Sequence, residues 1–372
     1  MNTILILGGY GYTGKLLTKH LLQQTKYKVI VAGRNVEKAQ AFASGLRDSR
    51  VAALRVDAAD PASLRSALQG VEPSAGLRPS LCLVAAPVRS INSEAVIGAC
   101  LEAGVDYLDV QYSTTKINLL KAHAEEIRER GLCFVTEAGY HPGLPSALVR
   151  YAASQLDCIE SAVTAGYLNM GGNLPFTEAV DELMEGFKAY RAQIFKNGAW
   201  TRPSSWDTRK FNFGPELGTR SCYSMFFEEL QDLPKMYPTL HETGFYISGM
   251  NWFVDLVAMP IIMIGLKVAP KRGIRPLGRL MWWGMMNLSR PPYRVALQVE
   301  AKGQRNGQQA QVHARCEHED GYELTAIPVV ALLMQYNQVR RPGLHMMGHL
   351  AEPTQLFEDM ECMGVRFTAT IE

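Results

Sequence analysis

A glycine-rich turn near the N-terminus constrains the fold of this 372-residue chain more than any other feature. The aliphatic run of residues 3–7 stops at Gly8, and a G-x-G-x-x-G pattern then leads into a segment with helical spacing. This order of strand, turn and helix indicates a dinucleotide-binding turn, whereas the pattern in isolation indicates only a surface turn. We expect Gly9 to make the tight turn, Gly11 to let a pyrophosphate approach the backbone, and Gly14 to let helix and strand pack closely. The predicted cofactor-binding residues of the turn are Gly9, Tyr10, Gly11, Tyr12, Thr13 and Gly14.

Apolar runs and helical segments alternate regularly along the first third of the chain. Strands are predicted at residues 3–7, 28–32, 51–56, 81–85, 107–110 and 132–135, and helices at 15–24, 36–46, 62–69, 93–103 and 116–130. Strands that alternate with helices at this interval indicate βαβ units and a parallel sheet with both faces covered. The predicted fold class is therefore α/β, a Rossmann doubly wound parallel sheet with a second α+β domain that contains an antiparallel sheet.

The pattern changes after Gly139, shortly before the expected start of the second domain at residue 143. Residues 293–325 alternate between apolar and polar side chains around Asn306 and Gly307, a pair that favours a hairpin turn. The other predicted elements are a helix at 144–156, a strand at 162–168, a long helix at 177–195, loops at 196–245, and closing helices at 327–336 and 354–363. The predicted domains are a nucleotide-binding Rossmann domain (1–142), a substrate and dimerisation domain (143–325) with an apolar segment at 245–290, and C-terminal helices (326–372) that pack back on the Rossmann domain.

The end of the second strand indicates which dinucleotide fits. A site selective for NAD ends this strand with an acidic residue that binds the ribose 2′-hydroxyl, whereas here Arg34 follows the strand and the nearest acid is Glu37. A guanidinium can pair with a 2′-phosphate, which favours NADP(H) over NAD; the alternative is a solvated surface arginine. Asp57 could receive the adenine amino group or cap the next helix, and small residues after the fourth strand would let the nicotinamide ribose lie against the backbone. The predicted cofactor-binding residues here are Gly33, Arg34, Asn35, Asp57, Ala85, Ala86 and Pro87.

Four motifs resemble the saccharopine dehydrogenase family, in its saccharopine reductase-like branch. They are G-G-Y-G-Y-T-G at residues 8–14, A-G-R-N at 32–35, Y-L-D-V at 107–110 and E-A-G-Y-H-P-G at 137–143. The similarity covers residues 1–156 well and residues 293–372 loosely. It implies a Rossmann domain followed by an α+β substrate domain, a nicotinamide cofactor and commonly a dimer. It also implies that the last motif faces the nicotinamide, with His141 where the family has aspartate.

Three side chains are candidates for the chemistry of hydride transfer, which needs orientation and a proton partner more than a nucleophile. His141 is a candidate proton donor or acceptor, because histidine titrates near neutrality; the alternative is a loop histidine bonded to backbone. Tyr112 is the second candidate, and its Y-x-x-x-K pattern with Lys116 is interpreted as coincidence because the match falls in a loop. Asp109 would orient either group or cap a helix. No metal site is predicted, since the seven cysteines contain no C-x-x-C motif.

Charged residues are unevenly distributed, although 38 basic and 36 acidic residues leave a net charge of only +2 and no basic field for nucleic acid. Asp255 is the only charged residue from Met250 to Leu266, a run too short for the roughly 20 residues of a membrane span. The segment 250–286 fits a dimer interface or a lipophilic substrate cavity, a peripheral membrane contact, or plain core. Basic residues and tryptophans follow the apolar run, namely Lys267, Lys271, Arg272, Arg275, Arg279, Trp282 and Trp283.

The leading hypothesis is an NAD(P)H-dependent oxidoreductase of the saccharopine dehydrogenase-like type. Its substrate would be an imine or a lipid-like unsaturated or carbonyl compound. The alternative is a non-catalytic NADP(H)-binding scaffold or redox sensor at a membrane surface. The expected partners are a small-molecule substrate, lipophilic in one interpretation, and a second copy of the chain in a homodimer, but no nucleic acid. Isolated cysteines and a short N-terminal apolar run favour a cytoplasmic location, with membrane association left open.

Overall fold

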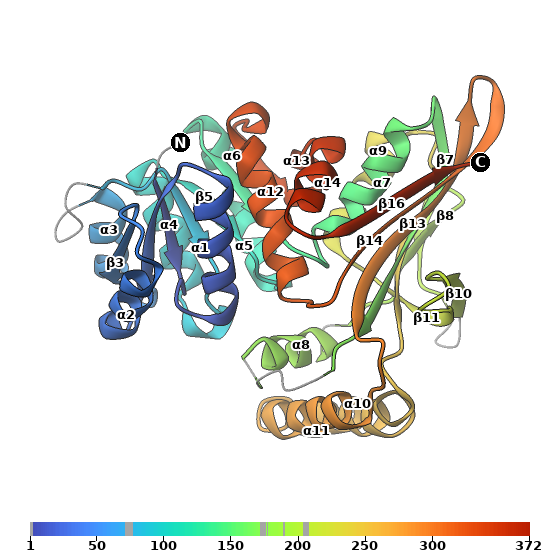
Figure 1. The fold of residues 1–372 in the computed structure, drawn as a ribbon, viewed down its shortest axis with the longest axis horizontal. Helices are drawn as coiled ribbons and strands as arrows, with labels where there is room; N and C mark the ends of the chain where they lie inside the picture. The colour runs from blue at the N-terminus through green and yellow to red at the C-terminus, as the bar shows by residue number, and fades with distance from the viewer. Residues whose placement is uncertain (1–2, 71–76, 172–175, 177, 189, 204–207) are drawn as a thin grey trace. The chain divides into compact units, whose positions relative to one another are not determined.

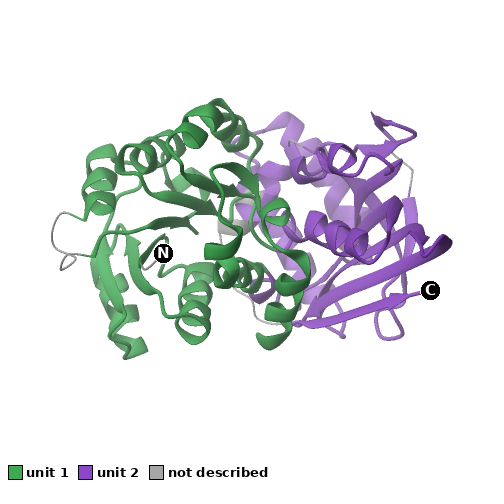
Figure 2. Ribbon diagram, turned by 90° about the horizontal axis from the view of Figure 1, so that it is seen from above, with its two compact units in different colours: residues 1–139, 325–363 green, residues 140–324, 364–372 purple. Residues whose placement is uncertain are grey.

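The computed structural model describes residues 3–70, 77–171, 176, 178–188, 190–203 and 208–372. The chain forms two compact units (Figure 2). The first unit contains residues 1–139 and 325–363, and the second contains residues 140–324 and 364–372. Each unit has its own sheet and its own core.

A seven-stranded parallel sheet lies at the centre of the first unit, in the order β15-β6-β5-β4-β1-β2-β3 (Figure 1). Its strands are β1 (Thr3–Leu7), β2 (Lys28–Gly33), β3 (Val51–Arg55), β4 (Leu81–Val84), β5 (Asp106–Asp109), β6 (Cys133–Thr136) and β15 (Gly343–Met346). Every residue of β1 is buried, as expected for a strand covered on both faces. Strand β1 lies between β2 and β4, so the strand order reverses there, and ligands of open α/β sheets bind beyond the carboxyl ends at such a point. The predicted Rossmann sheet is confirmed.

The helices of the first unit follow the predicted order with one correction. They are α1 (Tyr12–Gln24), α2 (Val36–Leu46), α3 (Pro61–Gln69), α4 (Ser93–Ala103), α5 (Thr114–Ala122), α6 (Ala124–Glu129), α12 (Glu323–Val339), α13 (Met347–Leu350) and α14 (Pro353–Cys362). The single helix predicted at 116–130 is wrong, because the chain leaves the helical conformation at His123. The ring of His123 lies 3.2 Å from the carboxylate of Glu126 in the first turn of α6, and no side chain caps this helix start.

A mixed nine-stranded sheet forms the second unit, with the main order β10-β11-β12-β7-β13-β14-β16 and with β8 and β9 at one side. Its strands are β7 (Cys158–Asn169), β8 (Ile194–Lys196), β9 (Ala199–Thr201), β10 (Thr208–Asn212), β11 (Thr219–Met225), β12 (Glu242–Ser248), β13 (Arg294–Arg305), β14 (Gln308–His318) and β16 (Arg366–Ile371). Strands β7 and β12 are parallel, and the other neighbours are antiparallel. The predicted hairpin is confirmed as β13 and β14, which turn at Asn306 and Gly307 with φ of +52° and +74°.

The helices of the second unit lie on and beyond this sheet. They are α7 (Leu144–Ser154), which packs on β7 and β13, α8 (Glu178–Lys188), α9 (Leu233–Met236), a π-helical turn (Val254–Ala258), α10 (Met259–Val268) and α11 (Ile274–Leu288). Helices α8, α10 and α11 and the π-helical turn enclose a separate apolar core (Figure 1).

Three further predictions about secondary structure are wrong. The long helix at 177–195 ends at Lys188 and is followed by β8, where Phe195 packs against Trp200; residue 177 lies outside the described residues. The segment predicted as loops at 196–245 contains β9 to β12, which alternation did not reveal because a strand such as β10 buries only Phe211. The C-terminal segment is not only helical, since β15 pairs with β6 and β16 pairs with β14.

Candidate functional site

The turn between β1 and α1 is closed by glycines that have no room for a side chain. Gly8 has a φ of +82°, and a Cβ there would lie 2.7 Å from the backbone nitrogen of Ala86. A Cβ on Gly14 would lie 2.3 Å from the carbonyl oxygen of Gly8, which is the close packing of helix and strand expected at this position. Gly9 lies within the turn that the hydrogen bond of 2.9 Å from the N–H of Gly11 to the carbonyl oxygen of Gly8 closes, and it packs against β2, while Gly8 adopts the left-handed conformation.

Gly11 leaves the other side of the turn open. A Cβ on Gly11 would have only the carbonyl oxygen of Gly8, at 3.1 Å, within 4 Å among the described residues outside its immediate chain neighbours. Helix α1 begins at Tyr12 without a capping side chain and without an acidic residue in its first turn. By contrast, a side chain caps each of the next four helices, namely Asn35, Asp60, Asn92 and Ser113. An uncapped helix start beside open backbone suits an anionic group, because its N–H groups and the helix dipole favour negative charge.

The end of β2 is held by a tyrosine of the same turn. Tyr10 packs on Gly33, where a Cβ would lie 2.4 Å from the tyrosine ring, and its hydroxyl accepts a hydrogen bond of 3.1 Å from the backbone N–H of Asn35. Arg34 is exposed and makes no ion pair or hydrogen bond within the described residues. Arg55 is also exposed and is the register partner of Gly33 at the end of β3. The sequence did not single out Arg55, whose place beside β2 follows from strand pairing.

The segments that follow β3 and β4 lie at the same carboxyl edge of the sheet as the glycine-rich turn. Asp57 accepts a hydrogen bond of 3.0 Å from the N–H of Ala59, and Asp60 rather than Asp57 caps α3, so the predicted capping role of Asp57 is wrong. The segment Ala85, Ala86 and Pro87 follows β4, and the carbonyl oxygen of Ala86 accepts a hydrogen bond of 2.5 Å from the side chain of Gln111. The other amide atom of Gln111, Oε1, is buried and has no partner within the described part of the chain. Gln111 was not among the predicted residues.

A buried charge pair fixes the loop after β5. Asp109 is fully buried and accepts hydrogen bonds from the ammonium of Lys116, from the hydroxyl of Thr136 at 2.9 Å and from the N–H of Gln111 at 3.1 Å. The Lys116 ammonium also donates to the carbonyl oxygen of Gln111 at 2.8 Å. Asp109 therefore holds the segment that leads to Tyr112, which is partly exposed. Lys116 thus holds this loop through Asp109 and Gln111. This structural role accounts for the lysine of the Y-x-x-x-K pattern.

The motif at residues 137–143 joins the two units, so its members belong to different units. Glu137 is buried in the first unit with a φ of +53°, a conformation that is uncommon outside glycine. His141 lies in the second unit, where its ring packs on Tyr140, Phe227 and Phe245 at centroid distances of 4.0, 6.1 and 6.0 Å. Its Nε2 atom is shielded from solvent and has no hydrogen-bond partner among the described residues. Burial lowers the pKa of His141 to about 4, so the imidazole is neutral at pH 7.

Glu229 is a buried carboxyl group that the sequence analysis missed. It accepts hydrogen bonds from the N–H of Gly143 at 2.7 Å, from the N–H of Ser146 at 3.1 Å and from the hydroxyl of Ser146. It thereby caps the start of α7, immediately after His141 in the chain. Burial raises the pKa of Glu229 to about 7, in opposition to these three hydrogen bonds. No local signal could have identified it, because it lies 83 residues after Ser146.

Glu229→Gln should change how stability depends on pH. The pKa of Glu229 is higher in the folded state than its ordinary 4.5, so its contribution to stability is present below pH 4.5 and is lost as the pH rises to 7. The wild type should therefore lose about 3 kcal/mol of stability between pH 4.5 and 7 that the variant does not lose. The difference in free energy of unfolding, variant minus wild type, should rise by this amount. His141 contributes in the opposite direction, since its lowered pKa adds stability from pH 4 to 6.5, and it cancels in this difference. Urea unfolding of both proteins across this pH range measures the difference. A difference that does not change with pH would contradict the raised pKa of Glu229.

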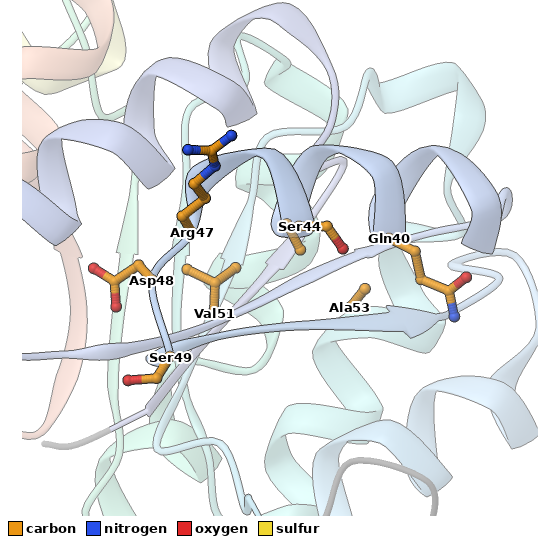
Figure 3. A pocket seen from close by; sticks show the side chains of 8 residues that line it. Gln40, Ser44, Arg47, Asp48, Ser49, Val51 and Ala53 are labelled. Carbon is orange, nitrogen blue, oxygen red and sulfur yellow. The ribbon is translucent and has the colours of Figure 1, made fainter.

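A surface pocket of about 420 Å³ lies between α2 and β3 (Figure 3). Its lining includes Arg47, Asp48 and Val51, at the amino end of β3. The glycine-rich turn follows the carboxyl end of β1, and parallel sheets bind their ligands beyond carboxyl ends. We therefore do not assign the nucleotide to this pocket. Within the described ranges, no three His, Cys, Asp or Glu side chains form a group that could hold a metal ion.

The first unit fits a dinucleotide at the carboxyl edge of its sheet. The uncapped start of α1 beside Gly11 suits a pyrophosphate, and the unpaired Gln111 Oε1 offers a buried acceptor at the end of β5. Arg34 at the end of β2 suits a 2′-phosphate. The predicted cofactor residues all belong to this unit, as do Tyr112 and Asp109, whereas His141 belongs to the other. The fold and the turn thus define a Rossmann nucleotide-binding protein.

Comparisons with known proteins agree with this class. Residues 4–132 match the saccharopine dehydrogenase NADP binding domain. Carboxyaminopropylagmatine dehydrogenase from Synechocystis sp. is 24% identical over 270 residues, which are 68% of this chain and 64% of that protein. Carboxynorspermidine synthase from Vibrio cholerae is 22% identical over 383 residues, covering 91% of this chain and 89% of that protein. The solved structure of saccharopine dehydrogenase (L-Glu forming) from Saccharomyces cerevisiae shares the fold over 100% of both chains, with a TM-score of 0.69 and 13% identity.

Residues 4–132 thus form a saccharopine dehydrogenase NADP binding domain, and the chain as a whole has the fold of saccharopine dehydrogenase. The resemblance seen in the four sequence motifs is thereby confirmed. The matching region spans just under two thirds of the length of the Synechocystis enzyme.

Proposed function

We propose that this protein is an NADP(H)-dependent oxidoreductase that transfers a hydride to the carbon of an imine C=N bond or, in the reverse direction, removes it from the corresponding carbon of the amine. The observation that carries the cofactor choice is the end of β2, where exposed Arg34 stands in place of an acidic residue and Arg55 lies on the neighbouring strand. A guanidinium attracts a 2′-phosphate and gives no advantage to a 2′-hydroxyl. The match of residues 4–132 to an NADP-binding domain supports the same choice.

The names of the two relatives support an imine over a lipid-like substrate. Carboxyaminopropylagmatine and carboxynorspermidine are both carboxylated amines. An oxidoreductase that forms or consumes such a compound acts most simply at a carbon–nitrogen bond. The lipophilic cavity considered for residues 245–290 receives less support, because many of the apolar side chains of this segment are exposed.

The residues of the first unit would hold the cofactor at three places. The backbone of residues 9–14 would bind the pyrophosphate, Arg34 the 2′-phosphate, and Ala85 to Pro87 the nicotinamide ribose. When bound, the nicotinamide supplies or accepts the hydride. Asp109 would act as a positioning residue, since it fixes the loop that carries Tyr112 through Lys116 and Gln111.

The proton at the substrate nitrogen would be exchanged by Tyr112 or His141. We favour Tyr112, because it is partly exposed at the carboxyl edge of the sheet. His141 would take part only as a neutral imidazole of low basicity, since burial lowers its pKa to about 4. In that form it can orient a ligand by hydrogen bonding, and its unpaired Nε2 is available for such a bond.

Arg34→Ala should weaken NADPH binding by roughly 10- to 100-fold and leave NADH binding unchanged, because a hydrogen-bonded charge contributes about 1.5–3 kcal/mol. Fluorescence titration of both cofactors measures the effect. Arg65→Ala is a matched control, since Arg65 is an exposed arginine on α3. Equal loss of affinity for both cofactors would contradict the role proposed for Arg34.

A further inference from the structure

The helices after β12 expose a continuous apolar stripe, which we call the outer stripe. Its members are Trp252, Leu256, Val257, Ile261, Ile264 and Val268. They recur every three to five residues apart from the adjacent pair at 256 and 257, so they lie on one face of the π-helical turn and α10. Four of them are more than 60% exposed, with Val268 at 79% and Leu256 at 73%. Such a contiguous patch on a soluble surface marks an interaction site.

The core of the second unit does not account for the outer stripe. The opposite face of the same helices is also apolar, and Val254, Ala258, Ile262 and Leu266 fill it and are buried against α8 and α11. A surface helix needs one apolar face for its own core, and here a second one remains in solvent. The hairpin of α10 and α11 lies beyond the ends of β7 and β13 (Figure 1), and the side chains of its second apolar face are exposed.

Aromatic side chains extend the stripe onto α11. Trp283 is 51% exposed, and its ring lies 5.5 Å from that of Phe253, which in turn lies 5.8 Å from the ring of Trp252. Tryptophan is the side chain most suited to the boundary between water and lipid headgroups, because its ring is apolar and its N–H is polar.

Basic side chains border this apolar surface. The basic cluster consists of Lys267, Lys271, Arg272, Arg275 and Arg279, all of them exposed. None of the five forms an ion pair with another residue that the structure describes. The one acidic residue between 250 and 286 is Asp255, which is partly buried and accepts a hydrogen bond of 2.9 Å from the N–H of Met250. Arg275 and Arg279 also lie over the ring of Phe176, at 5.9 and 6.0 Å from its centroid. The hairpin therefore presents, beside an apolar face, positive charge that no carboxylate among the described residues neutralises.

We propose that the outer stripe and the basic cluster dock this protein on the surface of an anionic phospholipid bilayer. The hairpin of α10 and α11 would lie in the plane of the interface, with the apolar side chains among the acyl chains and the cations at the phosphates. In the part of the chain that the structure describes, no helix is both long and apolar enough to cross a membrane. The proposal therefore concerns peripheral contact and does not depend on the proposed reaction.

The charges favour a bilayer over a second copy of the chain. A two-fold dimer through this face would place two basic clusters in one interface, because such an interface buries the same patch of both copies. The face has no exposed acidic residue between 250 and 286 to balance them, so the two clusters would repel each other. An anionic lipid surface neutralises the same cations. The homodimer expected from the sequence would use another surface.

Vesicle flotation tests the proposal with the full-length protein. We expect it to float with vesicles of phosphatidylcholine and phosphatidylglycerol in equal parts, and to float weakly with phosphatidylcholine alone or at high salt. The double variant Leu256→Glu/Ile264→Glu, and the variant with all five basic residues changed to glutamine, should each lose binding by at least about tenfold. These side chains are exposed, so circular dichroism should show a folded protein for both variants.

Matched controls separate docking from general charge and hydrophobicity. Tyr223→Glu/Met236→Glu alters exposed apolar side chains elsewhere in the same unit. A second control changes five exposed basic residues elsewhere to glutamine, namely Lys19, Lys26, Lys28, Lys302 and Arg305. Both controls should bind vesicles like the wild type. The proposal is overturned if the wild type does not float, if the stripe and cluster variants float as well as the controls, or if light scattering shows that the stripe variants only dissociate a dimer.

Discussion

Asp109→Ala should lower the free energy of unfolding by about 3–5 kcal/mol, which is the typical cost of leaving one partner of a buried ion pair uncompensated. Both side chains of the pair are almost fully buried, at 0% exposure for Asp109 and 1% for Lys116. The variant leaves the Lys116 ammonium with a single acceptor, the carbonyl oxygen of Gln111. It also removes the acceptor for Thr136 and for the N–H of Gln111. Urea unfolding monitored by circular dichroism measures the loss.

A second substitution distinguishes the buried charge from simple loss of packing. Asp109→Leu/Lys116→Met replaces the pair by apolar side chains and should recover most of the stability, because such replacements of buried pairs are often neutral. Asp232→Asn is the control at an exposed pair, with Lys235, and should leave the unfolding midpoint unchanged. If Asp109→Leu/Lys116→Met is no more stable than Asp109→Ala, the loss does not come from an uncompensated charge on Lys116, which would contradict the coupling that the structure indicates.

Gly14→Ala should destabilise the protein by about 1–3 kcal/mol and weaken dinucleotide binding by more than about tenfold. The added Cβ would lie 2.3 Å from the carbonyl oxygen of Gly8 and 2.7 Å from Cα of Gly9. Both obstacles are backbone atoms, so α1 must move away from the turn, and the N–H groups at its start move with it. Thermal unfolding and NADPH titration of the same variant measure the two effects.

Gly98→Ala is the matched control for this prediction. Gly98 lies within α4, and a Cβ there would have no atom within 4 Å outside its own helix backbone. Alanine is the better residue in a helix interior, so this variant should gain about 0.5–1 kcal/mol and bind NADPH normally. A Gly14→Ala protein that is as stable as the wild type would contradict the close packing of α1 on the turn.

The nucleotide-binding fold could be predicted because its determinants are local. The strands of residues 3–136 are short and, apart from β5 with its two aspartates, mainly apolar, and the turn at residues 8–14 directly follows the first of them. The role of Gly8 could not be separated from that of Gly9, since both are glycines and only the backbone shows which one has a positive φ. Strand β15 was missed because its pairing with β6 joins segments about 200 residues apart.

The polar groups around the candidate site were less accessible to prediction because they depend on tertiary contacts. Glu229 looks like an ordinary acid in the sequence, and only the fold brings it to the start of α7. The position of Arg55 beside Gly33 follows from the register of β2 and β3. The apolar segment was visible in the sequence, but its hydrophobic residues surround the helix, so periodicity could not show that Leu256 and Ile264 face solvent while Ile262 is buried.

Titration of the wild-type protein with NADPH and NADH is the most direct test of the central proposal, because the turn and Arg34 both act on the cofactor. Binding is measured by the change in nicotinamide fluorescence at physiological ionic strength. The structure predicts that NADPH binds at least about tenfold more tightly than NADH, in proportion to the additional charged contact at the 2′-phosphate. Binding of neither cofactor, or tighter binding of NADH, would contradict it.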